Sequence, residues 1–456
     1  MISPGPSGAP IPPTPAERFY TALIAGAAPL VLLNLTRRGF RNRAYWRRWG
    51  ERFGHGALPR DCPVWVHAVS VGEVQAAVPL VRLILERYPG LRVVVTTTTP
   101  TGSERVRAAF DHEVEHVYAA YDLPGAVGRF LDRARPRLAV FMETELWPNT
   151  LRLCAERAIP VVVANARLSE RSARGYSRFP GVVGPMLGRI GAIAAQGPRD
   201  AERFLALGVP RERVQVTGSL KFDVPLPASL REQAEALRRQ WGVDRSVWVA
   251  ASTHEGEEKR ILDAFDRLLQ HCPGSLLVLV PRHPERFARV LALARRMGFR
   301  VVQRTRAGED VTQAQVFLGD TMGELPLFFA AADVAFVGGS LVPTGGHNLL
   351  EPAALGVPVL FGPHVFNFAE VSGMLVERGA GRQVRGAREL AAVVCELFQD
   401  PNRRHAMGES AREAVVENRG ALERLMTVLE PQLGLLAGSG RGDASGAAPV
   451  SASTSR

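Results

Sequence analysis

The chain has 456 residues, of which 46% are hydrophobic, and its formal net charge is +11. This length allows two or three domains with separate cores, and the composition excludes a disordered chain. Four widely separated cysteines argue against a disulfide scaffold or a Cys-based zinc cluster, and favour a reducing compartment. The basic balance leaves three classes of partner open: nucleic acid, an anionic membrane surface and an acidic substrate.

The N-terminal region combines an apolar stretch with a basic, aromatic one. Residues 1–15 are rich in Pro and Gly, and we expect them to be disordered. Residues 19–36 carry no charge, and arginines mixed with Phe, Tyr and Trp follow up to residue 52. Such a belt suits a lipid headgroup layer. We therefore expect residues 16–52 to associate with a membrane and to keep the bulk of the chain on its cytoplasmic side.

The mode of this association stays open at the level of sequence. A spanning helix needs roughly 17 to 25 apolar residues, and Pro29 and Asn34 interrupt this short stretch. Residues 19–36 therefore either span the bilayer or lie in its interface. A cleaved signal peptide fits poorly, because its positive charge precedes the apolar core. A helix of a soluble protein that packs on its own domain is the remaining alternative.

From residue 64 onward, short apolar runs alternate with helical stretches. The runs are 64–69, 91–97, 138–142, 160–164, 192–195, 247–251, 276–281, 301–303, 316–318, 334–337 and 357–361. Strands that are apolar throughout and separated by helices predict parallel sheets covered on both faces. We therefore expect two doubly wound, Rossmann-like α/β domains, at residues 53–222 and 246–430. Residues 223–245 would form a linker, and residues 431–456, rich in Gly, Ala and Ser, a disordered tail.

Polar residues that follow the predicted strands are candidate site residues, because ligands of doubly wound sheets lie beyond the carboxyl ends of the strands. In the first half these are Glu73, Glu143 and Lys221, and Arg282 is one of them in the second half. Each also has a purely structural alternative: Glu73 could be a favourable partner of a helix dipole, and Lys221 an ordinary surface lysine. We expect the two sets to face a common central cleft.

Residues 337–356 combine a strand end, four glycines and a helix start. A glycine-rich turn that leads into a helix presents free backbone N–H groups to an anion, most often a phosphate. Glu351, one turn into the helix, would repel an anion, so we expect it to bind ribose hydroxyls. The chain has neither a P-loop motif nor the GxGxxG fingerprint of dinucleotide-binding domains, and it lacks HExxH and GxSxG.

Six motifs occur in a fixed order along the chain. They are residues 70–73 (SVGE), 143–149 (ETELWPN), 218–223 (GSLKFD), 281–287 (PRHPERF), 319–325 (GDTMGEL) and 345–352 (GGHNLLEP). Together they resemble the 3-deoxy-D-manno-octulosonic acid (Kdo) transferases of lipopolysaccharide synthesis. The resemblance implies a GT-B fold and an inverting glycosyltransferase that moves Kdo from CMP-Kdo to the lipid A precursor, lipid IVA. It also implies a location on the cytoplasmic face of the inner membrane.

The resemblance extends to individual residues. Glu73 stands where the family has its general base, and Glu143 and Lys221 stand at positions that support the transition state. The residues at CMP-contacting positions are Pro281, Arg282, Met322, Gly323, Glu324, Asn348, Leu349, Leu350 and Glu351. Lys221, Arg282 and the N–H groups at residues 347–349 could stabilise the departing phosphate. We therefore expect neither a metal nor a cofactor apart from the donor CMP-Kdo.

Two other functions remain as alternatives. Another sugar-nucleotide enzyme, such as a UDP-dependent transferase or a 2-epimerase, would share the glycine-rich turn and Glu351 but not the motif at residues 143–149. A basic protein that only binds nucleic acid or anionic lipid would give Glu73 no role. Arginines beside an apolar stretch favour lipid, and no nucleic-acid-binding module is present, so we expect no nucleic-acid partner. The number of Kdo residues transferred, the acyl preference for the acceptor and the oligomeric state stay open.

Overall fold

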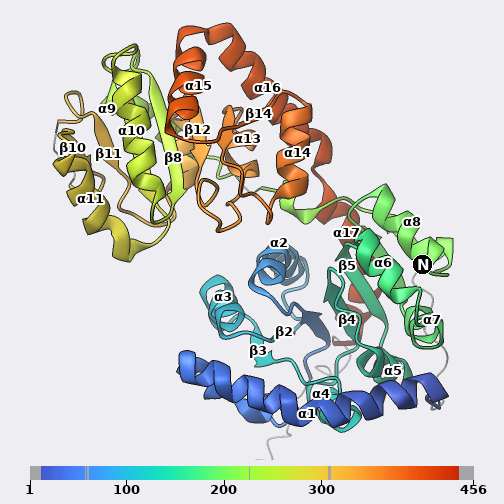
Figure 1. Cartoon of the computed structure of the whole chain (residues 1–456). Helices are drawn as coiled ribbons and strands as arrows, with labels where there is room; N and C mark the ends of the chain where they lie inside the picture. The colour runs from blue at the N-terminus through green and yellow to red at the C-terminus, as the bar shows by residue number, and fades with distance from the viewer. Residues whose placement is uncertain (1–11, 57, 59–60, 225, 307–309, 441–456) are drawn as a thin grey trace, which may run out of the picture. The chain divides into compact units, whose positions relative to one another are not determined.

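The computed structural model describes residues 12–440, except for residues 57, 59–60, 225 and 307–309. The expected disorder of residues 1–11 and 441–456 lies outside the described residues. The expectation is wrong at the end of the extension, because Thr14 caps a helix that begins at Pro15. Two compact units divide the chain: the first contains the residues up to Asp223 and those from Arg419 onward, and the second is Val224–Asn418 (Figure 1). The expectation of two doubly wound α/β domains is confirmed, and each unit is described by itself.

The first unit is built on a parallel sheet of seven strands in the order β3-β2-β1-β4-β5-β6-β7. The strands are β1 (Val64–His67), β2 (Val93–Thr97), β3 (Glu115–Tyr118), β4 (Leu138–Met142), β5 (Val161–Ala166), β6 (Ala192–Ala195) and β7 (Val214–Val216). The helices are α2 (Val71–Arg87), α3 (Pro100–Phe110), α4 (Pro124–Ala134), α5 (Pro148–Glu156), α6 (Glu170–Tyr176), α7 (Pro180–Gly188), α8 (Pro198–Ala206) and α17 (Ala421–Gly440). Short 3₁₀ helices are η1 (Arg43–Trp46), η2 (Trp49–Phe53), η3 (Arg211–Arg213) and η4 (Leu220–Phe222).

The second unit repeats this plan with the strand order β10-β11-β9-β8-β12-β13-β14. The strands are β8 (Val247–Thr253), β9 (Leu276–Pro281), β10 (Val301–Gln303), β11 (Val316–Leu318), β12 (Val334–Val337), β13 (Val359–Phe361) and β14 (Gly381–Gln383). The helices are α9 (Leu230–Trp241), α10 (Glu257–Leu269), the 3₁₀ helix η5 (Pro284–Arg286), α11 (Phe287–Arg296), α12 (Leu325–Ala330), α13 (Leu350–Ala354), α14 (Ala369–Glu377), α15 (Ala387–Gln399) and α16 (Pro401–Asn418).

Both strand orders contain a topological switch point, where the direction of winding reverses. It lies between β1 and β4 in the first unit and between β8 and β12 in the second. Loops that follow two such strands diverge to opposite sides of the sheet and leave a crevice at its carboxyl edge, which is where doubly wound sheets bind ligands. In the first unit, Glu73 and Glu143 follow the two strands beside this crevice. In the second unit, the residues after β8 and β12 hold the corresponding positions.

The structure differs from the expected boundaries at two helices. Residues 223–245 contain α9, whose Leu230, Ala234, Leu237 and Trp241 are buried in the second unit, so most of this segment is not a free linker. The second unit ends at Asn418 and not at residue 430, because α17 returns to the first unit. Leu425, Met426, Leu429 and Leu433 are buried there beneath the sheet. Residues 431–440, expected in the disordered tail, form the last part of this helix.

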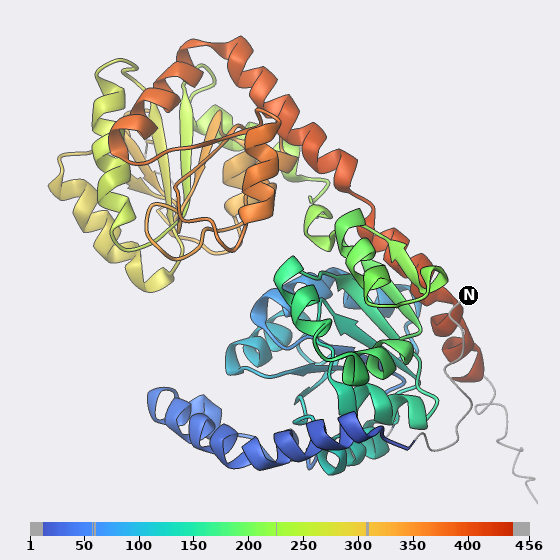
Figure 2. The same ribbon diagram turned by 45° about the vertical axis from the view of Figure 1, so that its right-hand side comes forward.

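Helix α1 (Pro15–Arg41) begins at a capping box formed by Thr14 and Glu17 and runs along one end of the first unit (Figure 2). Its first turns are tied to that unit by polar contacts: Glu17 forms a buried ion pair with Arg189, and the Tyr20 hydroxyl donates to Asp122 at 2.9 Å. Farther along, its large apolar side chains are exposed, including Leu23, Leu30, Leu33 and Phe40. The start of α1 is therefore held to the first unit by polar contacts, while apolar side chains farther along the helix are exposed to solvent.

The helical stretch Pro15–Phe40 is long and apolar enough to cross a membrane, with a mean hydropathy of 1.6, and only 6% of its 18-residue apolar window is buried. One stripe of the same helix nevertheless packs on the first unit: Ile24 and Leu32 are half-buried and Leu35 is buried, so the alternative of a helix docked on its own domain stays open. The arginine belt that follows is only partly available to lipid. Arg48 pairs with Glu51, and Arg52 is buried and donates to the Thr98 carbonyl oxygen at 2.9 Å.

Candidate active site

Glu73 lies in the first turn of α2, directly after β1. Its carboxylate accepts hydrogen bonds from the Val69 backbone N–H at 2.9 Å and from the Ser70 hydroxyl at 2.7 Å, while the Glu73 N–H donates back to Ser70 Oγ. Only 6% of the residue is exposed. Burial raises the pKa of Glu73 to about 7, the two hydrogen bonds oppose this rise, and the charges of Glu145 and Glu143 add to it. A carboxyl group with this pKa can gain and lose a proton near neutrality, as a general base must.

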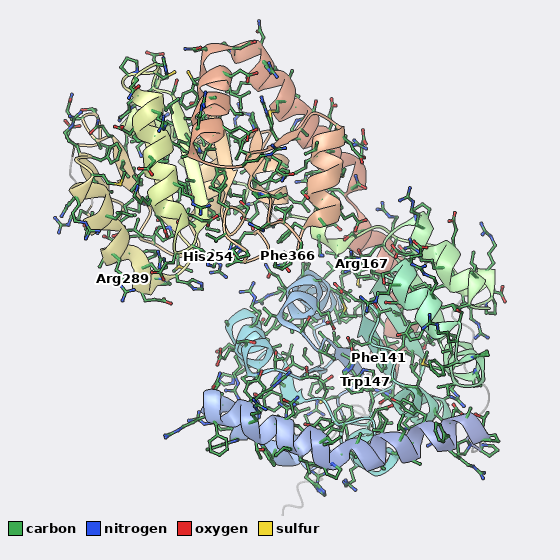
Figure 3. All side chains as sticks on the ribbon, in the orientation of Figure 1. Phe141, Trp147, Arg167, His254, Arg289 and Phe366 are labelled. Carbon is green, nitrogen blue, oxygen red and sulfur yellow. The ribbon has the colours of Figure 1, made fainter. Side chains whose placement is uncertain are left out.

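Glu143 and Glu145 stand on the loop that follows β4, the strand paired with β1. Glu143 has a left-handed backbone with φ of 55°, an uncommon conformation for a non-glycine residue that often marks a functional turn. Trp147, labelled in Figure 3, donates from Nε1 to Glu145 Oε2 at 3.0 Å. Its ring packs edge-on against the buried His67 ring, with centroids 4.7 Å apart. This packing fixes the orientation of the Glu145 carboxylate. Glu145 was not among the predicted site residues, although it lies two positions after Glu143 in the same motif.

Lys221 lies in η4, after the edge strand β7 and three strands away from β4. The turn is held by the buried Asn165, whose side-chain oxygen accepts the Leu220 N–H at 3.1 Å, and η4 packs on α2, the helix that carries Glu73. Lys221 is half-buried and has no hydrogen bond or ion pair within the described part of the chain. In the same motif Asp223 has a structural role, because its carboxylate accepts the N–H groups of Gly420 and Leu422 at the start of α17.

The predicted donor residues after β9 and β11 are surface-accessible. Arg282 is exposed, and its N–H donates to the Thr253 carbonyl oxygen, which places it beside the end of β8. Met322 is 59% exposed and is therefore not a core methionine, and Gly323 has a positive φ of 86°. Glu324 pairs with Arg304 at 2.7 Å, which lowers the pKa of Glu324 and keeps this carboxylate charged. Pro281 is buried at the end of its strand.

The first part of the glycine-rich turn, expected to bind a phosphate, is not free to do so. The backbone N–H groups of Gly339, Ser340 and Leu341 donate to the carboxylate of Glu257 at 2.6, 3.0 and 2.8 Å. Glu257 is fully buried at the start of α10. The first part of the turn is therefore filled by a carboxylate of the protein itself. The motif could not reveal this, because Gly339 and Glu257 are 82 residues apart in the sequence.

In the second part of the turn, the backbone N–H groups are free to bind an anion, as expected. No hydrogen bond to the described residues occupies the N–H groups of residues 347–349. Asn348 accepts the Leu350 N–H and donates to Glu351 at 3.0 Å. Burial raises the pKa of Glu351, while the hydrogen bond from Asn348 and the charge of Arg282 oppose the rise. Leu349 and Leu350 are fully buried, so only their backbone groups can meet a ligand.

Two histidines that the sequence did not single out as site residues meet in the second unit. His254 follows β8, His347 lies on the loop after β12, and their Nε2 atoms are 2.7 Å apart. A third histidine, His283, packs edge-on against His254 with ring centroids 5.3 Å apart. Among the described residues, no group of three or more His, Cys, Asp or Glu side chains is arranged to hold a metal ion.

Known proteins share both the sequence and the fold of this chain. A family model described as 3-deoxy-D-manno-octulosonic-acid transferase (kdotransferase) matches residues 47–224. The 3-deoxy-D-manno-octulosonic acid transferase of Haemophilus influenzae is 43% identical over 419 residues, which cover 91% of this chain and 98% of the relative. The transferase of the same name from Bordetella pertussis is 38% identical over 429 residues, covering 91% and 99%.

Among solved structures, UDP-GlcNAc 2-epimerase from Neisseria meningitidis aligns with a TM-score of 0.55, over 81% of this chain and 99% of that chain. At 14% identity this likeness shows the fold alone, the two-domain GT-B arrangement, and does not favour the epimerase alternative. Identity above 30% over almost the whole length of two relatives settles the family. The chain belongs to the 3-deoxy-D-manno-octulosonic acid (Kdo) transferases, which are glycosyltransferases of the GT-B fold.

Proposed function

We propose that this Kdo transferase uses CMP-Kdo as its donor, acts on the lipid A precursor lipid IVA, and inverts the configuration of the anomeric carbon. Family membership supports the transfer of Kdo itself. The observation that carries the proposed mechanism is the buried carboxyl group of Glu73, whose pKa is raised to about 7 at the switch point of the first unit.

Glu73 is the proposed general base. In an inverting transfer, a sugar hydroxyl of the acceptor attacks the anomeric carbon while CMP departs from the opposite face. Glu73 takes the proton of the attacking hydroxyl, a contribution of roughly 10²- to 10⁴-fold to the rate. The hydrogen bonds from Val69 and Ser70 leave lone pairs free on both carboxylate oxygens and fix their direction. The negative charges of Glu143 and Glu145 make Glu73 a stronger base.

Cationic groups and backbone N–H groups are proposed to stabilise the departing phosphate. Arg282 is exposed at the end of β9 and Lys221 has no charged partner in the described residues, so both can meet an anion without first breaking an ion pair. Within the second unit, Arg282 and the N–H groups of residues 347–349 would supply positive potential where negative charge develops, and the family position of Lys221 supports the same role for it. We therefore propose that transfer needs no divalent metal. Glu351 and Asn348 suit the ribose hydroxyls of CMP, and residues 322–324 border the same edge of the sheet.

We also propose that the protein works on the cytoplasmic face of the inner membrane. The exposed apolar side chains of α1 and the arginines that follow it match a surface of anionic lipid. The acceptor itself carries acyl chains and phosphates, so one surface can attract both the bilayer and the substrate.

The test of the base is Glu73→Gln. Gln is of nearly the same size and can keep both contacts, by accepting from Val69 N–H and donating to Ser70 Oγ, so the fold is retained. We expect affinity for CMP-Kdo within about twofold of the wild type and transfer reduced by roughly 10²-fold or more. Glu86→Gln, on the exposed face of the same helix, is the matched control. Unimpaired turnover by Glu73→Gln would remove Glu73 as the base.

The test of the donor site is Arg282→Ala. We expect the dissociation constant for CMP-Kdo to rise by about tenfold, because a charge-assisted contact to phosphate is lost. Arg289→Ala, an exposed arginine on α11 that Figure 3 labels, is the matched control. An unchanged donor affinity in Arg282→Ala would argue against the phosphate contact. Incubation of the purified protein with CMP-Kdo and a tetraacylated acceptor, followed by mass spectrometry, identifies the product and counts the Kdo residues added.

A further inference from the structure

Arg52 is a buried arginine at the end of the basic and aromatic belt, in the last turn of η2. Only 3% of the residue is exposed. Among the residues that the structure describes, no carboxylate forms an ion pair with its guanidinium; the neighbouring Glu51 instead pairs with Arg48 and accepts the Tyr118 N–H at 2.8 Å. The Nε atom of Arg52 also has no hydrogen-bond partner there. A buried cation without a carboxylate costs free energy, and such exceptions are typical of residues that serve a site.

Two contacts hold this guanidinium at the edge of the first sheet. It lies over the Tyr118 ring, 4.3 Å from the ring centroid, and its Nη2 group donates to the Thr98 carbonyl oxygen at 2.9 Å. The first contact packs η2 against β3, which is a purely structural role. The second contact reaches residues 98–99, the short loop that joins β2 to α3. Helix α3 packs beside α2, the helix that carries Glu73 (Figure 1).

Thr98 connects Arg52 to the loop that precedes α2. Its backbone N–H and its hydroxyl both donate to the Val69 carbonyl oxygen, at 3.1 and 2.9 Å. Val69 in turn donates its N–H to Glu73 Oε2 at 2.9 Å. A continuous chain of hydrogen bonds therefore runs from the buried guanidinium, across the loops that follow the neighbouring strands β2 and β1, to the carboxylate of Glu73.

We infer that Arg52 is a positioning residue for the proposed general base: by holding the Thr98 carbonyl group, it fixes Val69 so that the Val69 N–H stays bonded to the Glu73 carboxylate. This inference rests on the proposed function of Glu73, and Arg52 itself is too deeply buried to touch a substrate. The hydrogen bond from Val69 favours the charged form of Glu73 and opposes the effect of burial. Loss of Arg52 should loosen the loop, weaken this bond and make Glu73 harder to deprotonate.

A charge-neutral variant separates this effect from the loss of a cation. Thr98→Val removes the hydroxyl bond to Val69 and changes no charge near Glu73. The charges that act on Glu73 come from Glu143 and Glu145, on the loop after β4. The other charged residues on helices that pack against α2 are Lys221 on η4, Glu104, Arg105 and Arg107 on α3, and Glu423, Arg424 and Glu430 on α17.

The test is the pH dependence of kcat/KM for the acceptor, at saturating CMP-Kdo, in Arg52→Met and Thr98→Val. Met fills much of the volume of Arg but cannot donate to Thr98. In Arg52→Met we expect the midpoint to rise by about one pH unit, so that transfer is about fivefold slower at pH 7 and within about twofold of the wild type at pH 9. Thr98→Val should move the midpoint in the same direction. Arg105→Met, an exposed arginine on α3, is the matched control and should leave it in place.

The double variant shows whether Arg52 acts through Thr98. Both substitutions would then weaken the same bond, and the shift in the double variant would be smaller than the sum of the two single shifts. Additive shifts would overturn the inference, because Arg52 would then act on Glu73 by a separate route, such as its charge. If Arg52→Met does not fold, an unmoved midpoint in Thr98→Val is by itself enough to overturn it.

The possible outcomes separate this inference from the proposed function. A midpoint near pH 7 that disappears in Glu73→Gln, but that neither Arg52→Met nor Thr98→Val moves, would overturn the inference alone. An equal loss of rate at every pH, with the midpoint in place, would show that Arg52 only supports the fold, and would also overturn it. A midpoint that persists in Glu73→Gln would overturn the proposed base together with the inference.

Discussion

Glu73 shows how one buried side chain acquires a pKa suited to its proposed task. Removal from water favours the neutral acid, and the hydrogen bonds from Val69 and Ser70 recover only part of this cost. The charges of Glu145 and Glu143 raise the pKa further. Lys221 and Arg282, by contrast, are accessible cations without an ion pair among the described residues. The proposed mechanism thus gives the proton transfer to a buried carboxyl group and anion binding to accessible cations.

The pH dependence of transfer follows from this pKa. A general base works only when it is deprotonated, so kcat/KM for the acceptor, at saturating donor, should be low at pH 5 and rise through a midpoint near pH 7. Glu145→Gln removes a charge that raises the pKa of Glu73, so the midpoint should move to lower pH. Glu86→Gln should leave it in place. A midpoint that does not move in Glu145→Gln would contradict the proposed coupling between these two carboxyl groups.

The same burial predicts a cost in stability. The pKa of Glu73 is about 7 in the folded protein, against 4.5 for an ordinary Glu, so the folded state holds its proton more tightly between these values. The free energy of unfolding should therefore fall as pH rises from 4.5 through 7, by on the order of 3 kcal/mol. Glu73→Gln should be more stable than the wild type at pH 8 by a similar amount and equally stable at pH 4. Urea denaturation at the two pH values measures this, and equal stability at pH 8 would contradict it.

At the scale of elements, the glycine-rich turn after β12 depends on α10. The two oxygens of Glu257 each accept two backbone N–H groups, from His254 and Gly339 on one side and from Ser340 and Leu341 on the other. A buried carboxylate in this arrangement is fully satisfied, and it joins the loops on both sides of the switch point. The turn is therefore pre-formed by the protein, and the N–H groups of residues 347–349 remain available for the proposed ligand.

Substitution of Glu257 tests this dependence. In Glu257→Gln one acceptor oxygen becomes an NH₂ group, which leaves two buried backbone N–H groups unpaired at a cost of about 2–4 kcal/mol. Amide hydrogen exchange at residues 339–341 should accelerate, and the second unit should unfold at lower urea concentration. Glu255→Gln, two residues earlier and exposed, should change stability by less than about 0.5 kcal/mol. Unchanged exchange at these amides in Glu257→Gln would contradict the proposed support.

At the scale of the whole molecule, α1 connects the first unit to the proposed membrane surface. The ion pair between Glu17 and Arg189 and the bond from Tyr20 to Asp122 fix the start of the helix to folded protein. Leu23, Leu30 and Leu33 farther along are exposed. Because the first turns are occupied by polar contacts with the protein, we expect the helix to lie in the interface and not to cross the bilayer.

Vesicle binding measures this attachment. The double substitution Leu30→Asp with Leu33→Asp should weaken binding to vesicles of phosphatidylethanolamine and phosphatidylglycerol by roughly 10³-fold, because each buried leucine contributes about 2 kcal/mol. Leu435→Asp, at an exposed leucine on α17, is the matched control. Wild-type binding by the double variant would contradict the membrane role of this face.

The sequence by itself determined the fold class, because strands that are apolar on both faces and alternate with helices have few other solutions. Its motif order identified the family, and placing polar residues at strand ends selected Glu73, Glu143 and Arg282. It did not reveal the edge strands β3 and β14, which are short and carry polar or exposed residues. An edge strand is covered on fewer sides and leaves a weaker pattern.

Only the tertiary structure decided which distant parts of the chain meet. The amphipathic pattern of α17 shows that one face must be buried, but not that the chain returns to the first unit to bury it. The contacts of Glu257 with Gly339 and of His254 with His347 join residues 82 and 93 positions apart. Such contacts depend on which strands become neighbours in the sheet. Strand order is a property of the packed molecule, and no local pattern of residues contains it.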